Sequence, residues 1–196
     1  MGKRYGFAID LERCIGCDTC IVACKVEHEL RLGSGIRVET VGGPHRDTPS
    51  GKHPKLYMHY LPIPCMHCEF PPCREVCPND AIVKREDNIV VIEKEKCDGC
   101  MNCVDACPYE VIVQVKKESV PVKCDGCLER IVHGDDPFCA VCCETGAIKF
   151  GDLNNENSSI VREMNRRSSF LLKQELKTKP AVVYFPTRDG AFDKPI

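Results

Sequence analysis

The sequence predicts an α+β protein that repeats one small structural unit, and three observations support this prediction. Seventeen of the 196 residues are cysteines, gathered in four blocks. Short β-branched segments flank the blocks and favour strands, such as NIVVIE at 88–93 and EVIVQV at 110–115. The stretches IDLERCIGC at 9–17 and IEKEKCDGC at 92–100 share a pattern that indicates an internal repeat. Each unit is expected to contain a strand, a cysteine loop, a short helix and a second strand.

Composition and charge exclude several classes of protein. The stretch before the first cysteine has no apolar signal-peptide core and no twin arginine, and an odd number of cysteines fits a disulfide framework poorly. No apolar run reaches the roughly 18 residues that suggest a membrane span. Lys and Arg (27) nearly balance Asp and Glu (29), so the formal net charge of -2 indicates no nucleic-acid partner. There is no P-loop and no G-x-G-x-x-G, so no nucleotide or flavin site is expected.

The spacing within the cysteine blocks is the most specific feature. Blocks one and three match the bacterial ferredoxin run C-x-x-C-x-x-C-x-x-x-C, whose fourth cysteine binds the neighbouring cluster of a pair. Zinc sites use two C-x-x-C pairs and would leave the third and fourth cysteines of these blocks without a role. The spacing therefore predicts iron–sulfur clusters. The blocks are Cys14, Cys17, Cys20 and Cys24; Cys65, Cys68, Cys73 and Cys77; Cys97, Cys100, Cys103 and Cys107; and Cys124, Cys127, Cys139, Cys142 and Cys143.

Block four holds one cysteine more than the others. The third and fourth cysteines are four residues apart in blocks one to three, and the same offset from Cys139 selects Cys143. The pair Ala147-Ile148 also keeps its four-residue distance from Cys143, as the corresponding pairs do after blocks two and three. Sixteen cysteines are then expected ligands, and Cys142 is expected to be a small buried hydrophobic side chain. Alternative ligation or a redox role for Cys142 remains open.

The four blocks resemble the four-cluster, ferredoxin-like iron–sulfur subunit of molybdopterin oxidoreductases related to dimethyl sulfoxide reductase. The last block and the tail are most similar to the branch that serves thiosulfate, polysulfide, tetrathionate and arsenate reductases. The resemblance lies in CIGCDTCIVACK at 14–25, PCMHCEFPPCREVCP at 64–78, CDGCMNCVDACPY at 97–109, KCDGCLERI at 123–131, CCETGAIKFGDLNNENS at 142–158 and KTKPAVVYFP at 177–186.

The resemblance implies two bacterial-ferredoxin-like halves with two 4Fe-4S clusters each, a loop insert and a C-terminal tail. The outer half is expected at 1–24 plus 120–157, the inner half at 65–119, the insert at 25–64, and a tail for partner docking at 158–196. Sequential pairing of blocks one and two is an alternative that the spacing leaves open. The implied ligand sets are Cys14, Cys17, Cys20 and Cys143; Cys24, Cys124, Cys127 and Cys139; Cys65, Cys68, Cys73 and Cys107; and Cys77, Cys97, Cys100 and Cys103.

Two features depart from relatives in this family. Some relatives replace one ligand and hold a 3Fe-4S cluster, whereas this chain has all sixteen cysteines and no tryptophan, which implies four 4Fe-4S clusters. Lys25 and Glu144 stand where a proline usually follows the last cysteine. Because proline ends a helical turn, its loss is expected to soften the exit from these two helices without removing a ligand.

The expected function is electron transfer, because a cluster with four cysteine ligands has no open position for a substrate. By resemblance, the chain relays single electrons in anaerobic respiration between a molybdopterin (Mo or W) catalytic subunit and a membrane- or quinone-linked or soluble partner. A membrane anchor subunit is a further expected partner, and His67 is expected to bond backbone or cover a cluster. The alternative is a free-standing polyferredoxin or a carrier associated with hydrogenase or formate dehydrogenase. A peripheral or soluble location through the partner is expected, in the periplasm by co-export or in the cytoplasm.

Overall fold

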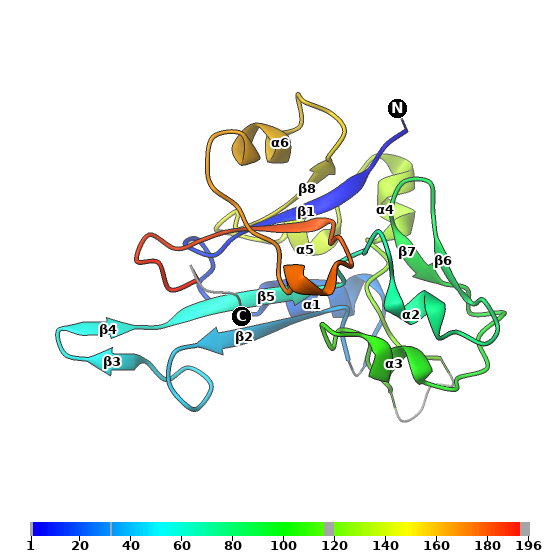
Figure 1. Ribbon diagram of the computed structural model, residues 1–196, viewed down its shortest axis with the longest axis horizontal. Helices are drawn as coiled ribbons and strands as arrows, with labels where there is room; N and C mark the ends of the chain where they lie inside the picture. Colours follow the sequence, from blue (N-terminus) through cyan, green and yellow to red (C-terminus); the bar gives the residue numbers. More distant parts are fainter. Residues whose placement is uncertain (1, 32, 116–119, 193–196) are drawn as a thin grey trace.

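A three-stranded sheet joins the beginning of the chain to its end. The computed structural model describes residues 2–31, 33–115 and 120–192 (Figure 1). The sheet has the order β8-β1-β9, with β1 antiparallel to β8 and parallel to β9. Helix α1 packs on α5 beside it, so that cysteine blocks one and four lie together. The bounds are β1 Tyr5–Asp10, α1 Thr19–Glu27, α4 Leu128–His133, α5 Phe138–Val141, β8 Ile148–Asp152 and β9 Val182–Phe185.

A smaller hairpin unit carries blocks two and three. Strands β6 (Ile82–Lys84) and β7 (Val90–Ile92) pair antiparallel, and α2 (Pro72–Glu75) packs on α3 (Asn102–Ala106). Strand β7 lies where NIVVIE predicts a strand. The strand predicted over 110–115 is wrong, because within the described residues it is reduced to a single bridge between Val113 and Val122.

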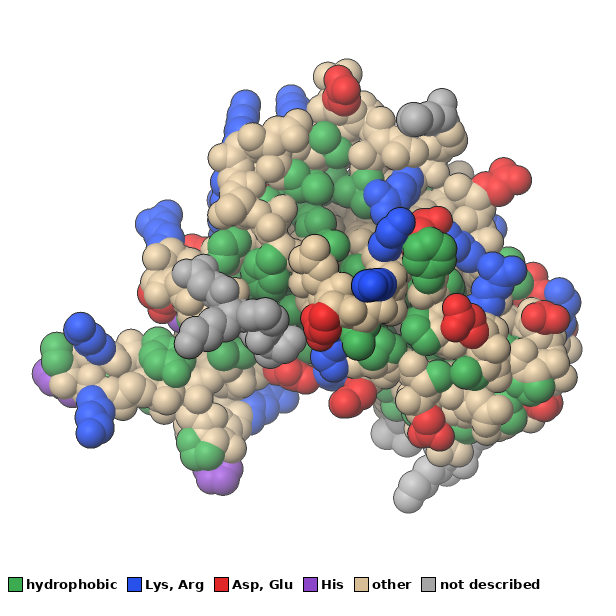
Figure 2. Space-filling model, in the orientation of Figure 1, with side chains coloured by type: hydrophobic (Ala, Val, Ile, Leu, Met, Phe, Trp, Pro, Cys, Tyr) green, Lys and Arg blue, Asp and Glu red, His purple; other side chains and the backbone are tan. Residues whose placement is uncertain are grey.

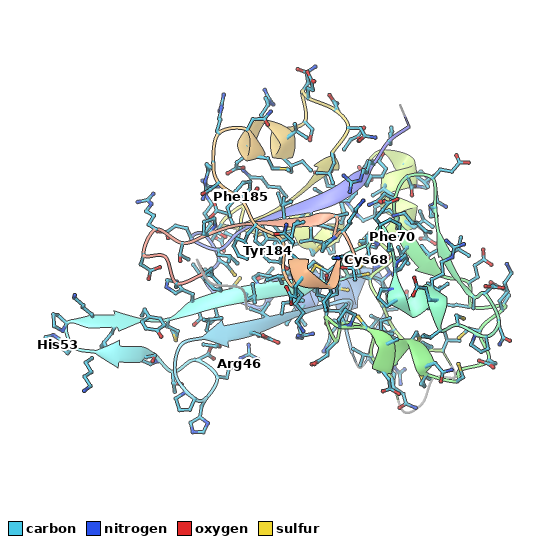
Figure 3. All side chains as sticks on the ribbon, viewed as in Figure 1. Arg46, His53, Cys68, Phe70, Tyr184 and Phe185 are labelled. Atoms are coloured by element: carbon cyan, nitrogen blue, oxygen red, sulfur yellow. The ribbon has the colours of Figure 1, made fainter. Side chains whose placement is uncertain are left out.

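The insert forms a β-ribbon, and the prediction of a loop there is wrong. Strands β2 (Ile36–Val41) and β5 (His59–Pro64) pair antiparallel along their whole length. The ribbon continues into the hairpin of β3 (Ser50–Lys52) and β4 (Lys55–Tyr57), which projects from the body, with His53 at its tip (Figures 1 and 3). The β-branched stretch IRVETV of β2 has the strand propensity that the glycine and proline content of the insert conceals.

The C-terminal segment is built into the core. It contains α6 (Ser159–Met164), the 3-10 helix η1 (Gln174–Leu176) and β9. Tyr184 and Phe185, labelled in Figure 3, are almost fully buried, at 0% and 1% exposure. The Tyr184 hydroxyl donates a hydrogen bond to the carbonyl of Pro62 at 2.9 Å. The segment therefore fastens the sheet to the insert, and its expected role in partner docking stays a prediction.

The absence of proline after block one has a visible effect. Helix α1 runs past Cys24 to Glu27, whereas α2 and α3 end before the cysteine that precedes Pro78 or Pro108. Within the described residues, no helix is long and apolar enough to cross a membrane. Figure 2 shows basic and acidic side chains interspersed on the visible face, in keeping with the small net charge.

Replacement of Tyr184 by alanine tests the role of the C-terminal strand in the core. Removing a large buried aromatic side chain costs about 3–5 kcal/mol of folding free energy, so the thermal midpoint should fall by at least about 6 °C. Circular dichroism under anaerobic conditions measures the midpoint. Tyr57→Ala is the matched control, because Tyr57 is 41% exposed and should shift the midpoint little. Equal midpoints for the two variants would contradict this role.

Candidate iron–sulfur centres

The cysteine loops share a left-handed turn that glycine supplies. In three of the four C-x-x-C loops a glycine precedes the second cysteine, with φ of 67° at Gly16, 73° at Gly99 and 74° at Gly126. Side chains rarely tolerate this conformation, and a Cβ on Gly16 would also lie 2.3 Å from the Tyr60 ring. In the CMHC loop His67 takes the glycine position, with φ of 41°. The turn brings two cysteine side chains of each loop to the same side.

The first quartet joins the two ends of the outer sheet. Cys143, just before β8, lies with three cysteines that follow β1, around a partly open cavity of about 330 Å³. The backbone N–H of Ile148 donates to Cys143 Sγ at 3.4 Å. Burial, with a smaller contribution from the Cys14 thiol, raises the pKa of Cys20 to about 12. Cys17 is exposed, whereas Cys20 is buried. The members are Cys14, Cys17, Cys20 and Cys143.

The second quartet lies between α1, α5 and the CDGC loop of block four. Burial raises the pKa of Cys139, and the thiols of Cys127 and Cys24 raise it further, which places these three side chains together. Burial also raises the pKa of Cys124 well above its ordinary value, and Cys65 and Cys139 add to the shift. Backbone N–H groups donate to two of the sulfurs, from Gly35 to Cys24 Sγ at 3.2 Å and from Gly126 to Cys124 Sγ at 3.3 Å. The members are Cys24, Cys124, Cys127 and Cys139.

The third and fourth quartets lie in the inner half. They line cavities of about 340 and 300 Å³, close in size to that of the first quartet. Burial raises the pKa of Cys68 and of Cys73 to about 12, and of Cys103 to about 11. The N–H of Ala81 donates to Cys77 Sγ at 3.3 Å. The members are Cys65, Cys68, Cys73 and Cys107 in the third quartet, and Cys77, Cys97, Cys100 and Cys103 in the fourth.

The grouping crosses the blocks over. The fourth cysteine of each block lies with the first three of the block it packs against, and this pairs block one with block four and block two with block three. The sequential pairing of blocks one and two is not the arrangement in this structure. The role of the sixteen cysteines as ligands stays a prediction.

The adjacent cysteines of block four differ in direction. Cys143 lines the cavity of the first quartet, and Cys142 lines no cavity identified among the described residues. Cys142 ends helix α5, where its N–H donates to the carbonyl of Phe138 at 2.9 Å. It is half-buried, so the expectation of a fully buried side chain is wrong. The position follows the last helical turn, where the side chain leaves the core.

The donor set fits a cluster better than a single ion. A zinc ion bound by sulfur at about 2.3 Å draws four sulfurs tightly around one point. Here cavities of about 300–340 Å³ lie between the thiols of three quartets. Thiols with such raised pKa values hold their protons at neutral pH, so a cationic iron core that replaces the protons relieves the cost of burying thiolates.

Two polar side chains near the quartets differ in how clearly the sequence marks them. His67 bonds backbone as predicted, since its Nδ1 accepts the N–H of Val90 at 3.0 Å. Lys123 does not stand out in the sequence, although its ammonium lies near the thiols of Cys65, Cys124 and Cys73. Only the placement of a lysine directly before a C-x-x-C pair marks it, and that signal is weak.

Two family models match the chain, a 4Fe-4S dicluster domain over residues 56–153 and a 4Fe-4S binding domain over residues 11–27. Together with the fold, they define an iron–sulfur protein of ferredoxin-like, cluster-binding domains. The prediction of an α+β fold of this class is confirmed. Cluster-binding domains of this class support electron relay.

Curated relatives match the chain over nearly its whole length. The iron–sulfur subunit of the anaerobic dimethyl sulfoxide reductase of Escherichia coli is 35% identical, over 96% of this chain and 95% of its own. The corresponding subunit of the polysulfide reductase of Wolinella succinogenes is 34% identical, over 98% and 100%. That of the tetrathionate reductase of Salmonella typhimurium is 35% identical, over 98% and 76%. The chain belongs to this family of reductase iron–sulfur subunits, as its motifs predict.

Serine substitutions at Cys142 and Cys143 test which of the two is a ligand. We expect Cys143→Ser to alter the electron paramagnetic resonance (EPR) spectrum of one cluster, because it removes a thiolate from the first quartet. Cys142→Ser is the matched control and should leave the spectrum, iron and acid-labile sulfide at the level of the unchanged protein. The reverse result would show that the offset of the other three blocks does not apply to block four.

Proposed function

We propose that the chain binds four 4Fe-4S clusters, one on each cysteine quartet, and relays single electrons between a molybdopterin catalytic subunit and a second redox partner. The observation that carries the proposal is the gathering of sixteen cysteines into four groups of four within one small fold. When bound, each cluster takes up and gives one electron. The chain supplies the thiolate ligands, backbone N–H donors to sulfur, and the apolar packing that excludes water.

The quartets follow one another as a relay. The thiol of Cys20 raises the pKa of Cys139, which brings the first quartet next to the second. The thiol of Cys65 likewise raises the pKa of Cys124, which brings the second quartet next to the third. The third and fourth quartets share helices α2 and α3. Cys17 in the first quartet and Cys100 in the fourth are exposed, which supports the first and fourth clusters as the two ends of the relay.

The outer half (1–24 plus 120–157) and the inner half (65–119) are proposed to hold two clusters each. The pairing of β1 with β8 and of β6 with β7 supports this division. Membership in a family of reductase iron–sulfur subunits supports a partner chain that carries the catalytic site. We place that partner at the first quartet, and the electron donor or acceptor, or a membrane anchor, at the fourth. A peripheral location would then come through the partners.

Exposed apolar side chains support the catalytic partner's position. Ile15, in the loop of the first quartet, is 59% exposed, and Val22 and Val26 on α1 are 57% and 64% exposed. Val22 and Val26 are four residues apart, so they lie on one face of the helix. Apolar side chains gathered on a surface favour a protein partner. The tail at 158–192 and the β3–β4 hairpin are proposed as further docking elements.

Purification of the chain from its native host under anaerobic conditions tests the proposal. We expect about sixteen irons and about sixteen acid-labile sulfides per chain, from four clusters of four. A large, pterin-containing chain should co-purify, as mass spectrometry and pterin fluorescence would show. A soluble monomer with the same iron content would favour a free-standing polyferredoxin, and a zinc protein without sulfide would overturn the proposal.

A charge placed on the exposed face of α1 tests the docking surface. Val22→Asp should reduce co-purification of the large chain at least about tenfold, the effect of about 1.4 kcal/mol, because it puts a carboxylate into an apolar contact. Its matched control is Val132→Asp on α4, where the valine is 68% exposed. Both variants should keep their iron content. Loss of the partner from the Val132 variant alone would move the docking site to α4.

A further inference from the structure

Two polar side chains lie where the outer and inner halves meet. His67 belongs to the CMHC loop of the third quartet, and Lys123 directly precedes Cys124 of the second quartet. Both are held by the backbone of Val90, at the start of β7: its N–H bonds His67 and its carbonyl bonds Lys123. One strand residue therefore fixes both side chains between the same two quartets.

The hydrogen bonds of His67 fix the position of its proton. Because Nδ1 accepts the Val90 N–H at 3.0 Å, the proton of the neutral ring must lie on Nε2. Nε2 is 3.7 Å from Cys124 Sγ, so the ring donates a hydrogen bond to a sulfur of the neighbouring quartet. The side chain is fully buried and stacks on Phe7, with ring centroids 6.3 Å apart, and its carbonyl accepts the side-chain amide of Asn88 at 3.4 Å. The ring is thus locked in this orientation.

The ammonium of Lys123 is bonded to carbonyl groups only. It donates to the carbonyls of Val90 and, at 2.6 Å, of Cys124. Within the described residues no carboxylate forms an ion pair with it. Burial lowers its pKa, but the nearby thiols of Cys65, Cys124 and Cys73 raise it by more, so the group is a cation beside both quartets.

We propose that His67 and Lys123 are a positioning pair that raises the reduction potentials of the two clusters at the junction of the halves. The inference rests on the proposed assignment of clusters to quartets. A cluster becomes one charge more negative when it takes up an electron, so a nearby cation and an N–H donor to sulfur both favour its reduced form. Lys123 acts on the second and third clusters, and His67 acts on the second cluster through Cys124.

The charge in this place has a consequence for the relay. Two anionic clusters next to each other repel, and without a cation between them the addition of an electron to either would be disfavoured. A lysine that neutralises part of this repulsion in a low-dielectric interior acts on both neighbours at once. The effect is therefore expected to be local to the two inner members of the relay.

Lys123→Met, which keeps the length of the side chain and removes its charge, tests the pair by EPR-monitored redox titration of the intact complex. Two of the four potentials should fall, each by an amount equivalent to about a tenfold change in the equilibrium constant, about 59 mV for one electron. Lys123→Arg should keep the potentials near those of the unchanged protein. Each potential is assigned by the Cys→Ser variant that alters its signal.

The matched control is Lys25→Met, because Lys25 also stands directly beside a cysteine of the second quartet and lowers the pKa of that residue, Cys24. This control should leave the potential of the third cluster unchanged. For the ring, His67→Phe should lower only the potential of the second cluster, and His67→Gln should restore it in part, since an amide donates a hydrogen bond again.

The outcomes separate this inference from the proposed function. Unchanged potentials in Lys123→Met and His67→Phe proteins that keep about sixteen irons would overturn the inference and leave the relay intact. Equal shifts in all four potentials would also overturn it, because a general structural effect would then explain them. Should Lys123→Met fail to assemble, the comparison of His67→Phe with His67→Gln decides. An unchanged protein without iron would instead refute the proposed function.

Discussion

The antiparallel pairing of β1 with β8 is the interaction on which the rest of the structure depends. It sets Ile9 opposite Ile148, so that the loop after β1 and the turn before β8 face each other across one edge of the sheet. Cysteines from the two ends of the chain therefore meet in one cavity. Strand β9 then pairs with the free edge of β1, and its buried tyrosine bonds the ribbon of the insert. One register thus positions the first quartet and the C-terminal strand together.

The thiols are part of the hydrophobic core rather than an addition to it. Cysteines of all four blocks pack with Phe7, Leu61, Ile89 and Tyr184 in one cluster that runs through both halves. Burial at this density raises thiol pKa values and makes bare thiolates costly. Iron bound to the sulfurs, backbone N–H groups directed at them, and one lysine near two quartets all offset that cost. The same groups stabilise the reduced form of a bound cluster, so stability and redox behaviour have a shared origin.

Exposure divides the proposed relay into ends and interior. The first and fourth quartets each present one cysteine at the surface, whereas the second and third lie where the halves join. Electrons can enter and leave only where a partner approaches closely, and the buried centres are protected from water. The apolar face of α1 lies beside one of the two exposed ends, which explains why the fold keeps large aliphatic side chains uncovered there.

The sequence by itself determined the features that depend on local spacing. Gly16 and its counterparts predict the cysteine turns because only glycine adopts their backbone without strain, and the four-residue offset distinguishes Cys143 from Cys142. The missing proline at Lys25 likewise predicts a helix that does not stop at block one. Only the tertiary structure decided which blocks share a cavity, why the insert is a ribbon, and how β9 enters the sheet. These contacts join residues far apart in the chain, and the period of a short strand says nothing of its partner. The same holds for the contact of His67 with Cys124 and for the inward direction of Lys123, because both depend on where Val90 lies after β7 has paired. Local chemistry set the ligands that we predict, and long-range strand pairing set their neighbours.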